Sequence, residues 1–90
     1  MQFEWDPKKA ESNRKKHGIA FEVAATIFGD PLAITFNDPD HSDDEFRRLT
    51  FGLSESGHLL VVAHTDRASK IRIISARVAG KAERRIYEEG

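Results

Sequence analysis

The 90-residue sequence contains no cysteine, only three prolines and six glycines, and no apolar run longer than residues 59–63. Without cysteine the chain forms neither disulfides nor thiolate zinc sites, which argues against a small secreted scaffold and favours a reducing compartment. The apolar run is too short to span a bilayer, and the N-terminus lacks the basic run, apolar stretch and cleavage site of an export signal. We therefore expect a cytoplasmic protein that does not enter a membrane.

The size and composition of the chain set its domain organisation. Its mass is 10.2 kDa, and 39% of its residues are hydrophobic, which is enough for one small core. A chain of this size buries only about 60–65% of the surface that its unfolded form exposes. We therefore expect a single domain over residues 1–90, whose modest stability favours a partner or a second copy.

The net charge of −1 hides an uneven distribution along the chain. Residues 38–45 hold five acidic side chains and no Lys or Arg, whereas residues 46–85 hold nine Lys and Arg against three Asp and Glu. The second half is therefore basic enough to bind an anion, and the acidic segment is able to mask it.

Metal and nucleotide sites have little support. Segment 38–45 is rich in oxygen ligands, but it lacks the Gly at the sixth position and the Glu at the twelfth that define a calcium loop. No two histidines have zinc-ligand spacing on one helix, and phosphate-binding Gly-rich patterns are absent. We expect no metal and no other cofactor.

Local patterns predict an α+β domain with two N-terminal helices, a sheet of about four antiparallel strands and a C-terminal helix. Asp6-Pro7 is typical of a helix start and Gly18 of a helix end, which predicts a first helix from Pro7 to about Lys16. Apolar residues at helical spacing predict a second helix over residues 21–28. The apolar period then becomes two, and the predicted strands and final helix cover residues 32–36, 47–53, 59–65, 70–76 and 79–89.

Arginine and histidine side chains on neighbouring strands form the main candidate site. The last hairpin is expected to place His64 opposite Arg72, and the preceding hairpin brings either Arg47 or Arg48 beside His64. Such an Arg–His–Arg row suits a phosphodiester, because the arginines hold the phosphate while His64 moves a proton. The row is also compatible with a surface ion-pair network involving the acidic residues 43–45, because such pairs are common.

Other basic side chains also have two interpretations. His17 is either a catalytic group or a cation that stabilises the end of the first helix. Arg67 lies at a turn and Arg77 at the far end of the last strand, so that they share a site only through a bend or a second subunit.

Several motifs extend from one end of the chain to the other: Phe3-Glu4-Trp5-Asp6, Lys16-His17-Gly18-Ile19, Asp30-Pro31, His41-Ser42 with Glu45 and Arg47, and Arg72-Ile73-Ile74-Ser75-Ala76-Arg77 followed by Glu83-Arg84 and Tyr87. Together they resemble the BrnT family, the ribonuclease toxins of type II toxin–antitoxin systems. The resemblance implies a RelE-like fold and RNA cleavage that inhibits translation. It also implies cleavage without a metal, because in RelE-like ribonucleases the 2′-OH of the RNA attacks the adjacent phosphate.

The resemblance further implies a BrnA-like antitoxin as partner. The ribbon-helix-helix domain of such an antitoxin binds the promoter of its own operon, so that the toxin reaches DNA only through it, in a dimer of toxin–antitoxin heterodimers. Individual roles are not assigned to the motif residues His17, Arg67, Arg72 and Arg77. Our hypothesis is that Arg72 and Arg47 clamp the phosphate and that His64 or His17 transfers a proton. The candidates for binding RNA or the antitoxin are Arg67, Arg77, Lys16 and Tyr87.

Two other functions stay open at this point. A catalytically inactive homologue would only bind its antitoxin in a promoter-bound regulatory complex, and the sequence is compatible with that. Direct DNA binding is less favoured, because no recognition-helix pattern is present and the net charge is not basic.

Overall fold

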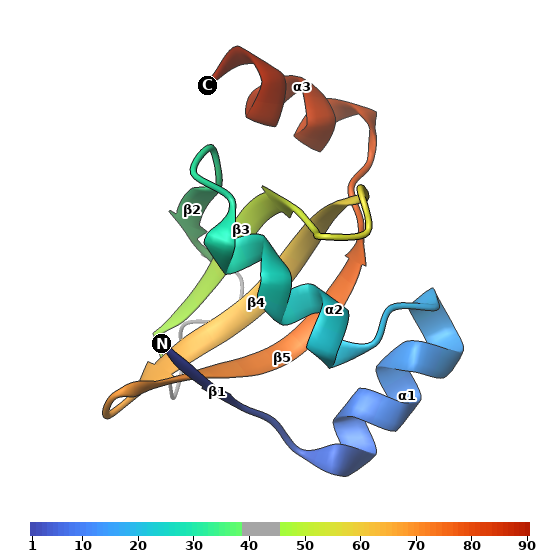
Figure 1. The fold of residues 1–90 in the computed structure, drawn as a ribbon, viewed down its shortest axis with the longest axis vertical. Helices are drawn as coiled ribbons and strands as arrows, with labels where there is room; N and C mark the ends of the chain where they lie inside the picture. The colour runs from blue at the N-terminus through green and yellow to red at the C-terminus, as the bar shows by residue number, and fades with distance from the viewer. Residues whose placement is uncertain (39–45) are drawn as a thin grey trace.

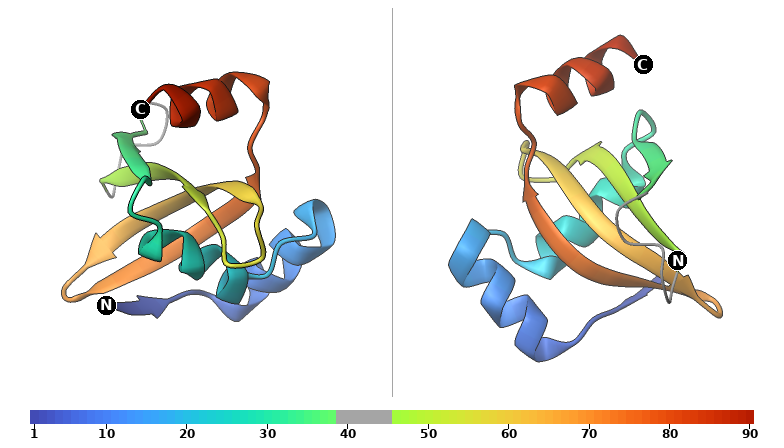
Figure 2. Two further views of the ribbon diagram at one scale, coloured as in Figure 1. Left: turned by 45° about the horizontal axis from the view of Figure 1, so that its top comes forward. Right: turned by 180° about the vertical axis from the view of Figure 1, so that it is seen from behind.

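A five-stranded sheet with strand order β1-β5-β4-β3-β2 forms the centre of the computed structural model, which describes residues 1–38 and 46–90 (Figure 1). The elements are β1 (Gln2–Glu4), α1 (Pro7–His17), α2 (Phe21–Ala25), the 3-10 helix η1 (Thr26–Gly29), β2 (Ile34–Asn37), β3 (Arg47–Leu53), β4 (Leu59–Arg67), β5 (Lys70–Val78) and α3 (Lys81–Glu89). Helix α2 crosses one face of the sheet, α1 lies along β5, and α3 extends past the end of the strands (Figure 2). No helix in these described ranges has the length and apolarity needed to cross a membrane.

The sheet differs from the prediction in strand number and in the direction of one edge strand. β1 pairs in parallel with the start of β5, which places Phe3 beside Ile71. Three residues carry almost no periodic signal, and β1 is fixed by packing instead: the ring of Phe3 lies 5.4 Å from that of Phe28, and Trp5 lies 5.9 Å from Phe21. The predicted α+β order is confirmed, but the four-stranded antiparallel sheet is a five-stranded mixed one.

The N-terminal helices follow their sequence signals closely. The Asp6 carboxylate accepts a backbone amide of α1 at 2.9 Å, and Gly18 ends the helix with a φ of 74°. The single helix predicted over residues 21–28 is divided into α2 and η1. At the junction the Thr26 hydroxyl donates to the carbonyl of Val23 at 2.6 Å. Such a hydrogen bond from a side chain to the backbone competes with the regular backbone hydrogen bonds of an α-helix.

Asn13 joins α1 to the free edge of β5. Because β1 pairs only with residues 70–72, the second half of β5 needs other hydrogen-bond partners. The side-chain amide of Asn13 donates to the carbonyl of Ala76 at 2.9 Å, and its oxygen accepts from the Ala76 amide at 3.1 Å. The same amide also donates to the carbonyl of Ile19 at 3.1 Å. One buried side chain therefore takes the place of a strand at this edge.

The sheet has two distinct faces. One face, the helical face, packs on α2 and η1 and forms the core with Phe21, Ala24, Ile27, Leu60, Val62, Ile73 and Ala76. Side chains alternate along a strand, so that residues 61, 63 and 65 of β4 lie on the opposite face. Strand pairing adds Arg47, Arg72 and Arg77 to that face, which we call the arginine face.

Candidate functional site

The register of the last hairpin separates His64 from Arg72. The hairpin turns on two residues, 68 and 69, where Ala68 has a φ of 55°. His64 therefore lies opposite Ile73, and Arg72 lies opposite Thr65. The predicted Arg–His–Arg row is wrong, because a difference of one residue in register moves a side chain to the other face of the sheet.

The pairing of β3 with β4 decides which arginine lies beside His64. Arg48 is opposite His64, whereas Arg47 is opposite Thr65. Because Thr65 also faces Arg72, the actual row on the arginine face is Arg47, Thr65 and Arg72. Two of the predicted side chains are thus brought together without the histidine that was expected between them.

His64 is a buried residue of the helical face and is only 4% exposed. Its Nε2 atom lies 2.7 Å from the hydroxyl of Thr50, which lies 2.8 Å from that of Thr35. The Phe28 ring meets the imidazole edge-on, with 4.9 Å between centroids. Burial lowers the pKa of His64 to about 4, and Arg48 also lowers it, against the opposing effect of Asp66. The imidazole is therefore neutral at pH 7, and it is too buried to contact a ligand on either face of the sheet.

This burial predicts a pH-dependent stability. The folded pKa of His64 lies below the unfolded value of 6.5, so only the unfolded chain binds a proton as the pH falls from 6.5 towards 4. We expect the free energy of unfolding to decrease by about 2 kcal/mol between pH 7.5 and pH 5 from this group alone. Urea unfolding of the wild type and of His64→Gln should show that loss only in the wild type. Equal pH dependence in both proteins would contradict this assignment.

Arg47 and Arg72 form the basic centre of the arginine face. The Nη1 atom of Arg72 lies 3.1 Å from Oε2 of Glu4, and the two side chains are 28% and 29% exposed. In the described ranges no carboxylate forms an ion pair with Arg47. The row spans three adjacent strands, so the Cα atoms of the two arginines lie about 10 Å apart. Two extended guanidinium groups at that separation can hold the same phosphate.

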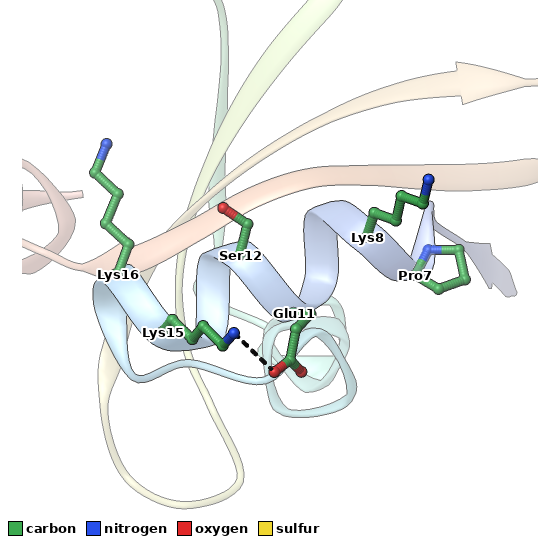
Figure 3. A pocket seen from close by; sticks show the side chains of 6 residues that line it. All are labelled: Pro7, Lys8, Glu11, Ser12, Lys15 and Lys16. Atoms are coloured by element: carbon green, nitrogen blue, oxygen red, sulfur yellow. Dashed lines mark ion pairs between the residues drawn. The ribbon is translucent and has the colours of Figure 1, made fainter.

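Lys16 and His17 lie at the end of α1, away from the row just described. His17 is exposed, and it shares a groove with Ile74 and Ser75 of β5. Figure 3 shows the outer surface of α1, where Lys16 extends freely while Lys15 pairs with Glu11 at 3.8 Å. The structure therefore places both predicted residues of α1 beside β5 rather than beside Arg47.

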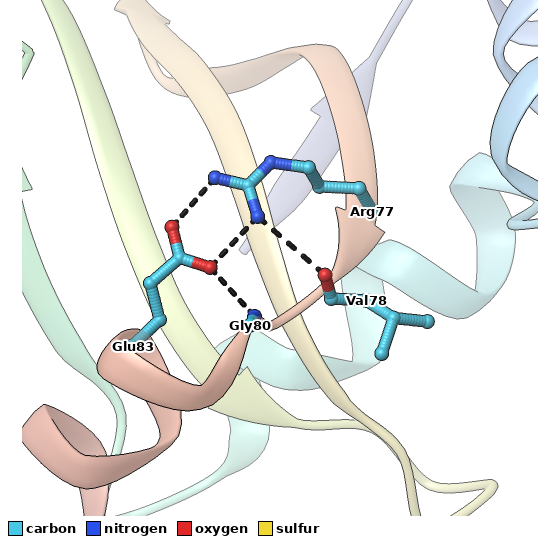
Figure 4. A network of polar contacts seen from close by, with 4 residues as sticks. All are labelled: Arg77, Val78, Gly80 and Glu83. Carbon is cyan, nitrogen blue, oxygen red and sulfur yellow. Dashed lines mark hydrogen bonds and ion pairs between the residues drawn. The ribbon is translucent and has the colours of Figure 1, made fainter.

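Arg77 is held by α3 (Figure 4). Its Nη1 and Nη2 atoms donate to Oε1 and Oε2 of Glu83 at 2.7 and 2.6 Å, and Oε1 also accepts the Gly80 amide at 2.8 Å. The hydrogen bonds of this pair raise the pKa of Arg77 and lower the pKa of Glu83. Arg77 therefore connects β5 to the first turn of α3.

We expect Glu83→Gln to weaken the attachment of α3 to β5 and so to increase local unfolding of the helix. The change removes the bidentate ion pair with Arg77 and weakens the hydrogen bond from the Gly80 amide. Because the pair is partly exposed, the expected loss of stability is only about 1 kcal/mol. Amide hydrogen exchange should become about fivefold faster in residues 81–89 and stay unchanged in the sheet. The matched control is Glu88→Gln, which removes an exposed pair at 4.0 Å from Arg84. Unchanged protection of α3 in Glu83→Gln would show that the pair does not hold the helix.

Tyr87 fixes the other end of α3. Its hydroxyl donates to Oδ2 of Asp30 at 2.6 Å, and this hydrogen bond is the main cause that raises the pKa of Tyr87. Asp30 also accepts the amides of Leu53 at 2.8 Å and Leu32 at 2.9 Å. Tyr87 thus links α3 to the loop before β2 and to the end of β3.

The remaining predictions concern the hairpin tip and the acidic segment. In the β4–β5 register Arg67 lies opposite Lys70 at the tip of the hairpin, whereas Arg77 lies opposite Val61 near the other end. The two arginines are therefore not neighbours, as predicted. The acidic residues 40–45, including those expected to pair with the arginines, lie outside the described residues. In the described ranges no group of three or more His, Asp or Glu side chains could hold a metal ion.

Comparison with known proteins gives the family. Residues 5–83 match the family described as the ribonuclease toxin, BrnT, of type II toxin–antitoxin systems. The crystal structure of the Brucella abortus ribonuclease toxin BrnT is similar, with a TM-score of 0.70 and 23% identity over 90% of this chain and 99% of that chain, which shows a common fold. No curated protein sequence matches the chain. Since the family match covers most of the sequence, the chain belongs to the BrnT family of ribonuclease toxins from type II toxin–antitoxin systems.

Proposed function

We propose that this chain is a metal-independent endoribonuclease that inhibits translation, and that it cleaves RNA on the arginine face. Membership of a ribonuclease toxin family supports the activity. One observation supports the arginine face as the place of cleavage: Arg47 and Arg72 flank Thr65 on this face of the sheet. Arg47 has no ion-pair partner among the described residues, and Arg72 has only Glu4.

In the proposed reaction the RNA supplies its own nucleophile. The 2′-hydroxyl loses its proton as its oxygen attacks the adjacent phosphorus and forms a 2′,3′-cyclic phosphate, while the bond to the 5′-oxygen breaks and that oxygen takes up a proton. Arg72 and Arg47 hold the non-bridging oxygens and stabilise the negative charge that grows in the transition state. Holding the 2′-oxygen in line with the leaving group contributes further to the rate.

Burial makes His64 unsuitable for proton transfer, which leaves His17 as the other predicted candidate. His64 is buried on the helical face, and its side chain is engaged with Thr50. His17 is exposed and shares its groove with Ser75, which faces Ala63 on the arginine face. Of the two histidines predicted for this role, only His17 is accessible to an RNA bound on the arginine face.

The family implies an antitoxin partner. We propose a BrnA-like ribbon-helix-helix antitoxin that carries the toxin to promoter DNA, in a cytoplasmic dimer of heterodimers. In this proposal residues 1–90 act as one toxin domain of the RelE-like kind. Lys16 binds RNA and Arg67 binds RNA or the antitoxin, while Arg77 and Tyr87 affect antitoxin binding through the position of α3.

The proposal is tested by inducing this chain alone in a bacterium. Growth should stop, and RNA incubated with the lysate in EDTA should acquire new 5′ ends. Normal growth and intact RNA in cells that contain soluble, folded protein would contradict the proposal. Such a result would favour the inactive module that only binds its antitoxin.

A further inference from the structure

We propose that the RNA strand beside the cleaved phosphate lies in a basic groove between α1 and β5, where Lys9 and Lys16 bind its phosphates. The inference rests on the proposed ribonuclease function and adds the path of the substrate. The groove, of about 210 Å³, is formed by one side of α1 and by residues 74 and 75 of β5.

The groove is continuous with the arginine face. Ser75 lines the groove, and it pairs with Ala63, whose side chain lies on the arginine face. Ser75 also lies between Arg72 and Arg77 along β5, both of which share that face. Seen from behind in Figure 2, α1 runs beside β5 at the edge of this face. A strand that leaves the phosphate site towards this edge therefore enters the groove.

Among the residues that the structure describes, none neutralises the charge of the groove. Glu11 is the acidic residue of α1, and it pairs with Arg14 at 3.1 Å and Lys15 at 3.8 Å. In the described part of the chain Lys9 and Lys16 form no ion pair. They are seven residues apart, or about 10 Å along the helix, which matches about three stacked nucleotides.

The exposed surface of α1 suits a nucleic acid better than a protein. Beyond Pro7 at its start, its exposed side chains are Lys, Arg, Glu, Ser and His, while Ala10 and Asn13 turn inward. Protein interfaces need buried apolar or aromatic anchors, and α1 offers none. The exposed large apolar side chains of the described residues lie elsewhere, at Met1, Leu32, Phe36, Phe46, Leu53, Val78 and Ile86. A polyanionic backbone is therefore the ligand that fits this groove.

The test measures binding of a single-stranded 2′-O-methyl RNA of 12 nucleotides, a probe that lacks the attacking hydroxyl, by fluorescence anisotropy at several salt concentrations. In Lys9→Gln/Lys16→Gln we expect about tenfold weaker binding, and a slope of log K against log salt that is smaller by about 1.4. The matched control is Lys8→Gln/Lys15→Gln, which changes the same charge at the same spacing but away from β5. It should change the affinity less than about twofold.

The outcomes separate this proposal from the ribonuclease function. Equal losses in both double variants, or no loss in either, would overturn the groove as the RNA path while leaving cleavage intact. A wild-type chain that binds no RNA and cleaves none would overturn the proposed function itself. If the Lys9/Lys16 variant binds the probe normally but is no longer neutralised by the co-expressed antitoxin, the groove belongs to the antitoxin and the proposal is wrong.

Discussion

Arg72→Ala should cleave RNA at least about 100-fold more slowly than the wild type while remaining folded. The guanidinium is the group on the arginine face best placed to meet the charge that develops on the phosphate, together with Arg47 across Thr65. Its pair with Glu4 is partly exposed, so that losing it should cost at most about 1 kcal/mol of stability. Cleavage rates of a synthetic RNA and thermal unfolding curves, measured on the same preparation, check both parts.

Two further variants separate this role from a general effect of charge. Arg72→Lys keeps the charge but loses the two-point geometry, and its rate should fall between those of the wild type and Arg72→Ala. Arg84→Ala removes the same charge from the exposed surface of α3, where Arg84 pairs with Glu88 at 4.0 Å, and should cleave normally. Full activity in a folded Arg72→Ala protein would show that Arg72 does not bind the reacting phosphate.

Asn13→Ala should destabilise the fold by about 3 kcal/mol. The substitution removes both side-chain bonds to Ala76 and the bond to Ile19, and it leaves buried backbone groups without partners. A loss of this size is a large fraction of the stability expected for a domain of this length. Urea unfolding measured at pH 7 would show the decrease directly.

Asn13→Asp provides the sharper comparison. The carboxylate can still accept from the Ala76 amide, but it cannot donate to the carbonyls of Ala76 and Ile19 and repels both. We expect this variant to be at least as unstable as Asn13→Ala at pH 7. Ser12→Ala, at an exposed neighbouring position, should change the stability by less than about 0.5 kcal/mol. Wild-type stability in Asn13→Ala would show that water replaces the amide at this edge.

Local signals in the sequence predicted most of the elements. The Asp6 cap and Gly18 define α1 because each acts on the backbone next to it. Alternating apolar residues mark β3, and a continuous apolar run marks β4, which is buried on both faces. The contacts that fix β1 and α1 to the sheet were not predictable in this way. Asn13 and Ala76 are 63 residues apart, and no local pattern identifies such a pair.

The candidate site was predicted in part for a related reason. Arg47 and Arg72 are on the same face, but the turn at residues 68–69 differs by one residue from the expected one, which places Thr65 rather than His64 between them. The partner of Arg72, Glu4, was missed because β1 was missed, although Phe3 and Trp5 alternate with polar residues. That alternation was the available signal for β1.

The central claim is that the RNA itself supplies the nucleophile while Arg47 and Arg72 stabilise the reacting phosphate. The most direct measurement identifies the ends of an RNA cleaved by the purified chain in EDTA, beside the same RNA carrying a single 2′-deoxy nucleotide at the cleaved position. The account predicts 5′-hydroxyl and 2′,3′-cyclic phosphate ends, and no cleavage at the 2′-deoxy position. Products with 5′-phosphate ends, or cleavage that persists at the 2′-deoxy position, would contradict it.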